Sequence, residues 1–544
     1  MKNLKTYLLA ALASAFVFTA CDEEDKLIQQ LEEENPIPGP VTGDPGPIDF
    51  STFISVGNSL TAGFQDGALY TDGQNQSFPA LLARQFQIQG VGGGEFNQPD
   101  INSANGRSGV NPDGGFFGRF ELSLSLLAPV PTVGEDITPF TGDKATLRNF
   151  GVPGMRSIDI ANPLYGQGNP FYGRFATAPG MSTVLGDALA TAPTFFTYWL
   201  GNNDILGYAS GGGADDSAIT PIADVQASLT QGLGALVQSG AQGVTLTVPL
   251  IVTTPYFRAV PYNAIPLDDQ GLVDQLNGAF ASVNQAIQLA ADLSFITQAD
   301  ADARKVEYTL GANPILMADE YLVDLGPFFD GLGLPPEQRA ALEPYRLSRP
   351  ATADDLPLLT SATVLGTEVG GNPLALVGIT VPAEDRLILS ATEVQITVAG
   401  RASINATIAG VVDAINANAG AEVITLVDVQ PAMADLAGLD AQTAAALVDP
   451  SLIPGSPFPM IPALREMANN AAARADGELG IVIQGVSLSP DFSPNGVYST
   501  DGIHPNPRGA GLFGNEILNV LNASKGSSIP LIDVLALRGI LATN

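Results

Sequence analysis

Short apolar runs alternate with segments of helical periodicity along much of the chain. The runs lie at residues 53–56, 194–200, 244–248 and 423–427, and each ends at a glycine, proline or aspartate. Apolar residues recur at helical spacing before the third run (Val225, Leu229, Leu233, Leu236, Val237) and before the fourth (Ile404, Ile408, Val411, Val412, Ile415). This alternation predicts strands separated by helices, and therefore an α/β fold whose parallel sheet is covered on both faces.

Two long stretches fall outside this alternation. Residues 68–147 are rich in Gly, Asn and Pro, and residues 292–393 mix short helical and strand-like segments. We interpret both as insertions, of the kind that covers a site as a lid or cap, in a domain spanning residues 48–525. Residues 526–544 are expected to form a C-terminal tail. A chain of 544 residues is long enough for this arrangement.

The first 20 residues have the pattern of a secretory signal peptide. Lys2 and Lys5 precede an apolar stretch, residues 7–18, that is too short to span a bilayer as a stop-transfer helix. Small residues then precede Cys21, the only cysteine, which resembles the lipobox of bacterial lipoproteins, with Phe18 where Leu is usual. We therefore expect lipidation of Cys21. The alternative is a plain secretory signal with a chance cysteine.

The residues after Cys21 indicate a sorting signal followed by a tether. Residues 22–25 are all acidic and resemble the signal that directs some Gram-negative lipoproteins to the outer face of the outer membrane. Residues 26–47 are rich in Glu, Pro and Gly and cannot bury a core. We expect residues 21–47 to form an acidic tether and the protein to be lipid-anchored to the outer membrane of the cell envelope. Surface exposure stays open.

The charge balance excludes one class of partner. With 56 acidic and 23 basic residues, the formal charge of -33 repels nucleic acid, so we expect no nucleic-acid partner. One histidine and one cysteine exclude metal centres built from several such ligands. Carboxylate sites for calcium or magnesium stay open, although no run resembles a calcium-binding loop. We expect no cofactor and no catalytic metal.

A serine directly follows the first predicted strand. Ser59 lies in Gly57-Asn58-Ser59-Leu60, at the opening of a helix whose N-terminal amides favour developing negative charge. A serine becomes a useful nucleophile only when a neighbouring base takes its proton. The alternative is a serine that merely caps the helix.

A histidine and an aspartate near the C-terminus can supply that base. Asp501 and His504 are three residues apart, before a predicted helix at residues 508–522. At this spacing the carboxylate can fix the orientation and tautomer of the imidazole. It can also stabilise the imidazolium that forms when His504 takes the serine proton. The alternative is a structural histidine.

Two further loops offer hydrogen-bond donors. Gly154 closes the glycine-punctuated loop at residues 149–154 and can present its backbone N–H to an oxyanion. Asn203 follows the second predicted strand and can donate its side-chain amide, while Asp204 can brace that loop. An ordinary turn is the alternative interpretation at both places.

Taken together, these loops resemble the SGNH (GDSL-like) hydrolase family, which is named for its Ser, Gly, Asn and His residues. Residues 57–60 are similar to the first block of the family, with Asn58 in place of the usual Asp. Residues 149–154 resemble the second block, 201–204 the third and 501–504 the fifth. The resemblance implies a three-layer α/β/α sandwich, flavodoxin-like, with a parallel sheet of about five strands.

The resemblance also implies an activity. Ser59 would be the nucleophile of an esterase or lipase that cleaves carboxylic esters through an acyl-enzyme, with His504 as base and Asp501 as its orienting residue. The backbone N–H groups of Ser59 and Gly154 and the Asn203 amide would form the oxyanion hole. The substrate would be a lipid, a short-chain ester or an acylated glycan. Two alternatives stay open: a polysaccharide deacetylase or acyltransferase using the same residues, and a non-catalytic surface lipoprotein that binds glycans or lipids.

Overall fold

The computed structural model describes residues 41–126, 128–436 and 481–543. The signal peptide expected at residues 1–20, the lipidation site at Cys21 and the tether as far as residue 40 lie outside these ranges. Within the described part, no helix is long and apolar enough to cross a membrane.

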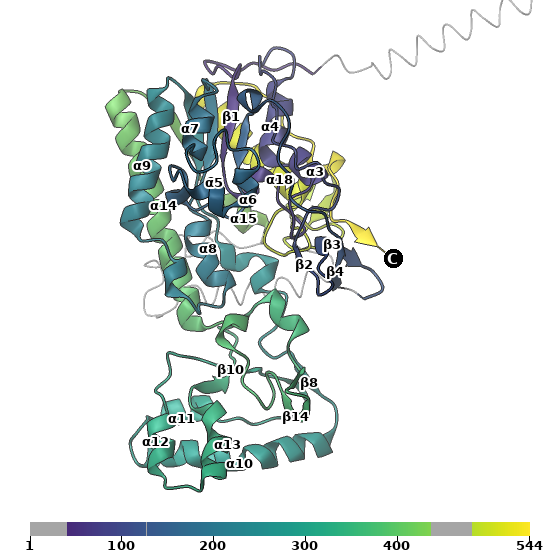
Figure 1. Cartoon of the computed structure of the whole chain (residues 1–544), viewed down its shortest axis with the longest axis vertical. Helices are drawn as coiled ribbons and strands as arrows, with labels where there is room; N and C mark the ends of the chain where they lie inside the picture. The colour runs from purple at the N-terminus through teal and green to yellow at the C-terminus, as the bar shows by residue number, and fades with distance from the viewer. Residues whose placement is uncertain (1–40, 127, 437–480, 544) are drawn as a thin grey trace, which may run out of the picture.

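A five-stranded parallel sheet forms the centre of the larger of two bodies (Figure 1). Its strands are β1 (Phe53–Gly57), β5 (Asn149–Gly151), β6 (Phe195–Trp199), β7 (Gln242–Leu246) and β16 (Ile424–Val427). They lie in the order β16-β7-β6-β1-β5. Numbered by their place in the chain and read from β5, this order is 2-1-3-4-5. In such a sheet, ligands bind at the carboxyl ends of the strands, where the order reverses next to β1.

Helices cover both faces of this sheet, because successive side chains of a strand point to opposite sides. The four longest covering helices are α4 (Phe78–Phe86), α9 (Ile222–Gln238), α14 (Ala391–Ala419) and α18 (Pro507–Lys525). On one face, Ile54 and Val56 lie in a buried cluster with residues of α9 and α14. On the other face, Phe53 and Trp199 lie in a buried cluster with residues of α4 and α18. The fold is therefore mixed α/β, with a parallel sheet flanked by helices.

Four of the five strands coincide with apolar runs predicted from the sequence, although β7 begins two residues before its run. The fifth strand was not predicted, because the glycines of residues 149–154 indicate a loop. Residues Asn149–Gly151 instead pair with β1, with Ser55 opposite Asn149 and Gly57 opposite Gly151. A strand of three residues at the sheet edge is too short to show an apolar pattern.

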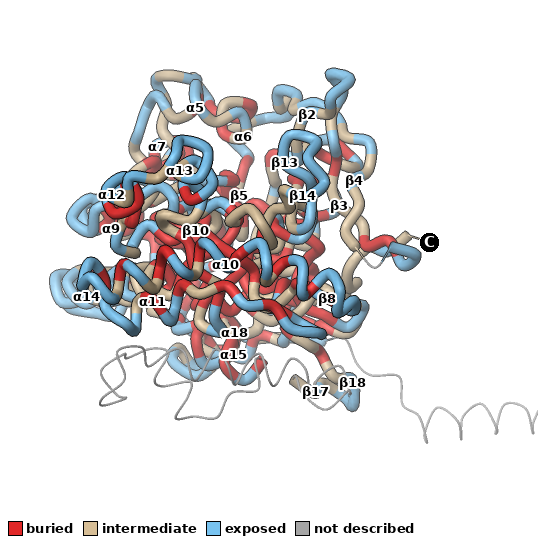
Figure 2. The backbone as a smooth tube through the Cα atoms, turned by 90° about the horizontal axis from the view of Figure 1, so that it is seen from below, coloured by how far each residue is buried: buried red, intermediate tan, exposed pale blue. Residues whose placement is uncertain are grey.

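A smaller lobe follows β7 in the chain (Figure 1). Its helices are α10 (Gln270–Asp292), α11 (Gln298–Arg304), α12 (Gly326–Gly331) and α13 (Pro336–Leu342). It has its own buried cluster, which extends from Ile265 to Ile388. The lobe therefore begins earlier than the expected insertion at residues 292–393, because α10 packs inside it. Seen from below in Figure 2, buried segments of the chain gather at the centre and exposed loops form much of the rim.

Short strand pairs lie in the lobe and, for β12 with β15, where the lobe joins the larger body, because Leu356 and Leu389 pack in the core of that body. They are β8 (Ile265–Leu267) with β9 (Gly311–Asn313), β10 (Leu316–Ala318) with β11 (Ser348–Pro350), β12 (Leu356–Pro357) with β15 (Ile388–Leu389), and β13 (Glu368–Val369) with β14 (Asn372–Leu376). Further elements of the larger body are α2 (Ser59–Ala62), α3 (Thr71–Asn75), α5 (Tyr165–Gly168), α6 (Pro170–Gly173), α7 (Val184–Leu189), α8 (Asn203–Ser210), α15 (Gln430–Leu436), β17 (Ile481–Ile483) and β18 (Val486–Leu488).

Both ends of the described chain join the larger body. Within the stretch expected as a first insertion, residues 68–147, α4 covers the sheet, while β2 (Gly109–Val110), β3 (Phe116–Ser123) and β4 (Ala128–Val133) form a separate small sheet with β19 (Ala542–Thr543). The expected tail at residues 526–544 buries Ile529 and Ile532 in the cluster under α18. The end of the expected tether also pairs with the body, since the Asp44 N–H donates to the Ser528 carbonyl at 3.3 Å.

Candidate active site

Ser59 is the first residue of α2 and directly follows β1. Asn58 caps this helix, because its side-chain oxygen accepts a hydrogen bond from the Leu60 N–H at 3.0 Å. The Ser59 hydroxyl is therefore not needed for capping. The turn is tight, since a Cβ at Gly57 would lie 2.8 Å from the Trp199 carbonyl oxygen of the neighbouring strand.

Ser59, His504 and Asp501 form one hydrogen-bonded chain. The Nε2 atom of His504 lies 2.9 Å from the Ser59 Oγ, and its Nδ1 atom lies 3.0 Å from the Asp501 Oδ2. Only 12% of each of the Asp501 and His504 side chains is exposed, and Ser59 is buried. The loop that carries Asp501 and His504 precedes α18, and α18 packs against the sheet through the cluster it shares with α4. A hydroxyl, an imidazole and a carboxylate in this arrangement can transfer the hydroxyl proton to the imidazole.

Backbone N–H groups hold the Asp501 carboxylate. Its Oδ1 accepts from Ile503 at 2.8 Å and from His504 at 2.9 Å, and its Oδ2 accepts from Gly67 at 2.9 Å. Burial opposes ionisation of Asp501, but the neighbouring His504 and these N–H groups outweigh it and lower the pKa to about 2. The carboxylate is therefore ionised at neutral pH and fixed beside the imidazole.

Residues 64–67 contribute to this site and were not singled out from the sequence. The Phe64 ring lies 5.0 Å from the His504 ring, measured between centroids. Asp66 is buried and accepts hydrogen bonds from the Tyr70 hydroxyl at 2.7 Å and the Thr500 N–H at 3.0 Å. Burial raises the pKa of Asp66. The Asp66-Gly67 pair is a turn signal in the sequence, but nothing local indicates that the turn contacts residues 499–501.

The structure brings the two predicted oxyanion loops together. Gly154 follows β5 with a φ of +80°, and a Cβ there would meet only Asn169, at 3.9 Å. Asn203 opens α8 after β6, and its side-chain amide donates to the Met155 carbonyl at 3.0 Å. This bond uses one of the two N–H groups of the Asn203 amide, and the other stays available to a ligand.

Asp204, which was expected to brace its own loop, instead joins that loop to the one after β5. Its carboxylate accepts from the backbone N–H of Ser157 at 2.9 Å and from the Ser157 hydroxyl at 2.7 Å. Asp204 is fully buried. The loops after β5 and β6 are therefore held in fixed positions at the carboxyl end of the sheet.

An apolar cavity adjoins Ser59 and His504. Its walls include Leu206, Ile251 and Phe513, and Asn203 lines it while Gly154 does not. Asn202 also lines this cavity, is only 4% exposed, and has no hydrogen-bond partner for either of its side-chain polar atoms. Both asparagines therefore line the cavity, whereas only Asn203 was singled out from the sequence.

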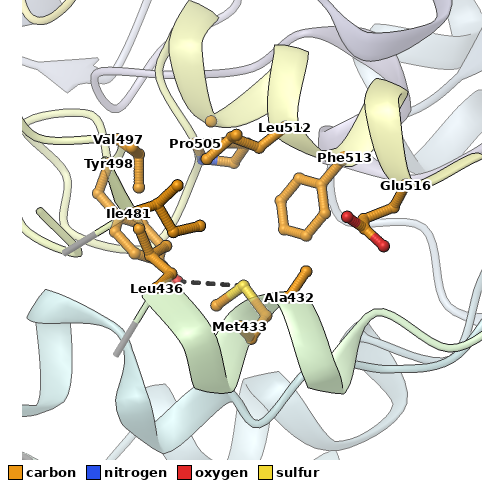
Figure 3. Close-up of a pocket in the computed structure, with 11 residues that line it drawn as sticks. Ala432, Met433, Leu436, Ile481, Val497, Tyr498, Pro505, Leu512, Phe513 and Glu516 are labelled. Atoms are coloured by element: carbon orange, nitrogen blue, oxygen red, sulfur yellow. Dashed lines mark hydrogen bonds between the residues drawn. The ribbon is translucent and has the colours of Figure 1, made fainter. Parts of the chain in front are cut away.

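A second apolar pocket lies beside the first (Figure 3). Side chains of α15 and α18 face each other across it, and Glu516 stands at one side. The two pockets share Met433, Tyr498, Pro505 and Phe513. The Tyr498 hydroxyl lies 4.0 Å from the Met433 sulfur, so this pair forms part of the wall between them.

The chain segment that leads into the lobe contacts the loop of Asp501 and His504. The Tyr256 N–H donates to the Gly502 carbonyl at 2.9 Å, and the Tyr256 hydroxyl donates to the Ser210 carbonyl at the end of α8 at 3.1 Å. Gly502 has a φ of +74°, and a Cβ there would lie 2.8 Å from the Tyr256 nitrogen. The base of the lobe is thus attached to the loop that carries the histidine.

A group of carboxylates away from this cavity could hold a metal ion. Glu320, Asp385 and Glu393 bring their oxygens within 4.8 Å of one another. None of the three lines the cavity at Ser59. None of them was singled out from the sequence, because Glu320 lies 65 positions from Asp385 and the three follow no calcium-loop pattern.

No protein-family model, curated protein or solved structure matches the chain. Its function is therefore inferred from its own residues and their geometry.

Proposed function

We propose that this protein is a serine ester hydrolase of the SGNH type, with Ser59 as its nucleophile. The observation that carries the proposal is the hydrogen-bonded chain from Asp501 through His504 to Ser59 at the carboxyl end of the sheet. An isolated serine hydroxyl reacts slowly, and a base at hydrogen-bonding distance makes it a nucleophile. The 2-1-3-4-5 strand order and the helices on both faces support the three-layer, flavodoxin-like sandwich that the resemblance implies.

The reaction proceeds in two halves. His504 accepts the Ser59 proton through Nε2 as Oγ attacks the ester carbonyl, and the imidazolium then protonates the leaving alcohol. Water hydrolyses the resulting acyl-enzyme, with His504 again as base and then as acid toward Ser59. Asp501 remains ionised and stabilises the imidazolium in both halves.

Negative charge that develops on the carbonyl oxygen needs donors in fixed positions. The backbone N–H groups of Ser59 and Gly154 and the free N–H of the Asn203 amide supply them in this proposal. The bonds from Asn203 to Met155 and from Asp204 to Ser157 support it, because they hold both donor loops before substrate binds.

The apolar walls of the cavity favour an ester with an apolar acyl chain. Leu206, Ile251 and Phe513 offer no hydrogen bonds from their side chains and would contact methylene groups. Each methylene buried there contributes roughly 0.8 kcal/mol to binding. We therefore propose esters with apolar acyl chains longer than acetyl, including lipids, as the substrate class, in preference to acetylated glycans.

We further propose that the enzyme is lipid-anchored to the outer membrane through Cys21. The support is the sequence alone, because Cys21 lies outside the described residues. A Cys21→Ser variant should leave the membrane fraction, whereas unchanged fractionation would refute the anchor.

The hydrolase is tested with a series of p-nitrophenyl esters from acetyl to palmitoyl, at low and high salt. Ser59→Ala and His504→Ala should each lower kcat by at least about 10⁴-fold, with circular dichroism spectra unchanged. A fluorophosphonate probe should label the wild type and not the Ser59→Ala variant. Substantial turnover by a folded Ser59→Ala protein would refute the assignment. A folded wild type without turnover or labelling would point to a binding role.

A further inference from the structure

Three carboxylates meet where the lobe joins the larger body. Glu320 follows β10 in the lobe, Asp385 opens a short 3-10 helix (Asp385–Leu387), and Glu393 lies in the first turn of α14. Each offers one oxygen, and these oxygens lie within 4.8 Å of one another. Oxygens bound to one Ca²⁺ at about 2.4 Å are at most about 4.8 Å apart. The three groups are therefore close enough to bind the same ion.

Glu393 and Asp385 each have a buried carboxylate oxygen without a hydrogen-bond partner, and Asp385 as a whole is partly buried. Glu393 is fully buried, and while its Oε2 accepts from the Ser390 N–H at 2.6 Å, its Oε1 has no hydrogen-bond partner. The Asp385 Oδ1 is likewise buried without a partner. A buried charged oxygen without a partner destabilises the folded state. Burial, together with the Glu320 carboxylate, raises the pKa of both groups.

The described residues provide no basic partner for this group. Within residues 41–126, 128–436 and 481–543, no Lys, Arg or His forms an ion pair with Glu320, Asp385 or Glu393. Arg386 is adjacent to Asp385 but pairs with Glu384. The three negative charges therefore depend on protons or on a cation from solution.

A neighbouring group shows the contrasting arrangement. Arg349 donates to Asp319 at 2.7 Å and to both oxygens of Asp355 at 2.7 Å. Arg349 thus neutralises these two buried carboxylates. Asp319 is paired in this way, whereas Glu320, the next residue in the chain, is not. The arginine is fully engaged by them, which leaves the next group without one.

The body packs closely around this group. A Cβ at Gly213, just after α8, would overlap the Glu393 carboxylate, and one at Gly212 would overlap the Asp385 carbonyl oxygen. Both glycines have a positive φ. The carboxylates are therefore held in place from the body side, while Glu320 is exposed and leaves a path from solvent.

We propose that Glu320, Asp385 and Glu393 bind a divalent cation, Ca²⁺ in preference to Mg²⁺, which fastens the lobe to the larger body. Carboxylate oxygens are hard ligands that suit these ions rather than zinc or copper. Ca²⁺ accepts irregular geometry and bidentate carboxylates, whereas Mg²⁺ requires a near-ideal octahedron. Glu320 belongs to the lobe, and Glu393 belongs to α14, which packs on α8 and α9 (Figure 1). A shared ion therefore links the two bodies.

The test uses the full-length chain, stripped with EDTA and dialysed into NaCl buffer that screens its surface charge. Ca²⁺ should raise the melting temperature by several degrees in a saturable manner, and Mg²⁺ should do so at no less than tenfold higher concentration. Tb³⁺ provides a direct readout, because it replaces Ca²⁺ and luminesces when a nearby tyrosine is excited. Tyr208 and Tyr321 are the tyrosines expected to excite it, because Glu393, after burial, contributes to the raised pKa of both. Added Ca²⁺ should displace the Tb³⁺ signal.

Variants assign the binding to this group. Asp385→Asn and Glu393→Gln should each weaken Ca²⁺ binding at least tenfold and remove most of the Tb³⁺ signal. Without Ca²⁺ these variants should melt no lower than the stripped wild type, because each removes a repelling charge. Glu384→Gln is the matched control, since Glu384 is adjacent to Asp385 and exposed, and pairs with Arg386. This variant should bind Ca²⁺ as the wild type does.

Two outcomes would overturn the proposal. Equal melting temperatures of the stripped and Ca²⁺-loaded wild type, with no Tb³⁺ signal, would mean that the carboxyl groups share protons instead. Ca²⁺ stabilisation that persists in the Asp385→Asn/Glu393→Gln double variant would place the ion elsewhere on this acidic protein.

Discussion

The Nε2 atom of His504 lies 2.9 Å from the Ser59 Oγ, although 445 positions separate the two residues in the chain. Ser59 is positioned by the turn from β1 into α2, and His504 by its bond to Asp501. The two meet only when α18 packs on the sheet beside α4. The proposed activity of this pair would therefore depend on the packing of the whole larger body.

The Asp501→Asn variant tests whether Asp501 sets the tautomer of His504, on which its role as a base depends. An amide at this position can present its N–H to Nδ1, which favours the tautomer whose Nε2 carries the proton and cannot accept another. We expect kcat to fall by about 10³–10⁴-fold with KM little changed. Steady-state kinetics on the best p-nitrophenyl ester measures this. A loss below tenfold in a folded variant would mean that Asp501 does not orient the histidine.

Asp501 should also shape the stability of the protein in acid. Its pKa falls from 3.8 to about 2 on folding, so the folded state favours the carboxylate. The resulting stabilisation, about 2 kcal/mol, is present above pH 4 and is lost as the pH falls towards 2. Urea unfolding of the wild type and Asp501→Asn should therefore differ most above pH 4 and converge below it. A difference independent of pH across this range would contradict the assignment.

The sequence indicated the residues of the candidate site better than it indicated their surroundings. Ser59, Asn203 and the pair Asp501 and His504 each stand in a short local pattern, so their neighbours in the chain reveal them. The contact of Gly67 with Asp501 spans 434 positions, and no local pattern encodes it. The same reason hides the Glu320 group, because Glu320 lies 65 positions from Asp385 in the chain.

The same distinction decides which elements of the fold could be predicted. Elements with a local sequence pattern were predicted, and elements defined by long-range contacts were not. Buried strands such as β6 carry a continuous apolar run, because both faces of the sheet are covered, and they were predicted. The edge strand β5 was not predicted, since pairing with β1 rather than an apolar pattern defines it. The lobe boundary was placed too late, because the periodicity of α10 cannot indicate which core it packs in.

The two neighbouring asparagines provide a matched pair for the oxyanion hole. Asn203→Ala should lower kcat by about 10²–10³-fold, because it removes a donor to the developing negative charge. Asn202→Ala should change kcat less than tenfold and should not lower the melting temperature, because its amide has no partner to lose. The comparison is kcat for both variants on one ester. The reverse ranking would assign the oxyanion donor to Asn202.

The cavity at Ser59 should set acyl-chain preference. Leu206→Trp fills it with a larger apolar side chain. We expect kcat/KM for decanoyl and longer esters to fall at least tenfold, and that for the acetyl ester to change less than threefold. Leu293→Trp, at an exposed position in the lobe, is the control and should leave both unchanged. A uniform loss across chain lengths would show that the acyl group lies elsewhere.

A substitution at Gly502 tests whether the segment that leads into the lobe holds the loop of Asp501 and His504 in position. Gly502→Ala forces a Cβ to within 2.8 Å of the Tyr256 nitrogen at a φ of +74°, so the loop must move away from the N–H that bonds to it. Left-handed backbone alone costs an alanine about 1–2 kcal/mol, and the displaced loop carries His504. We expect both a lower melting temperature and a kcat reduced by at least tenfold.

Gly526→Ala is the control for backbone strain, because Gly526 has a φ of +68° with nothing within 4 Å of a Cβ. This variant should lose similar stability from strain and keep its kcat. If Gly502→Ala and Gly526→Ala lose stability alike and both keep full kcat, the contact with Tyr256 does not position His504. If only Gly502→Ala loses kcat, the segment entering the lobe holds the loop that carries the base.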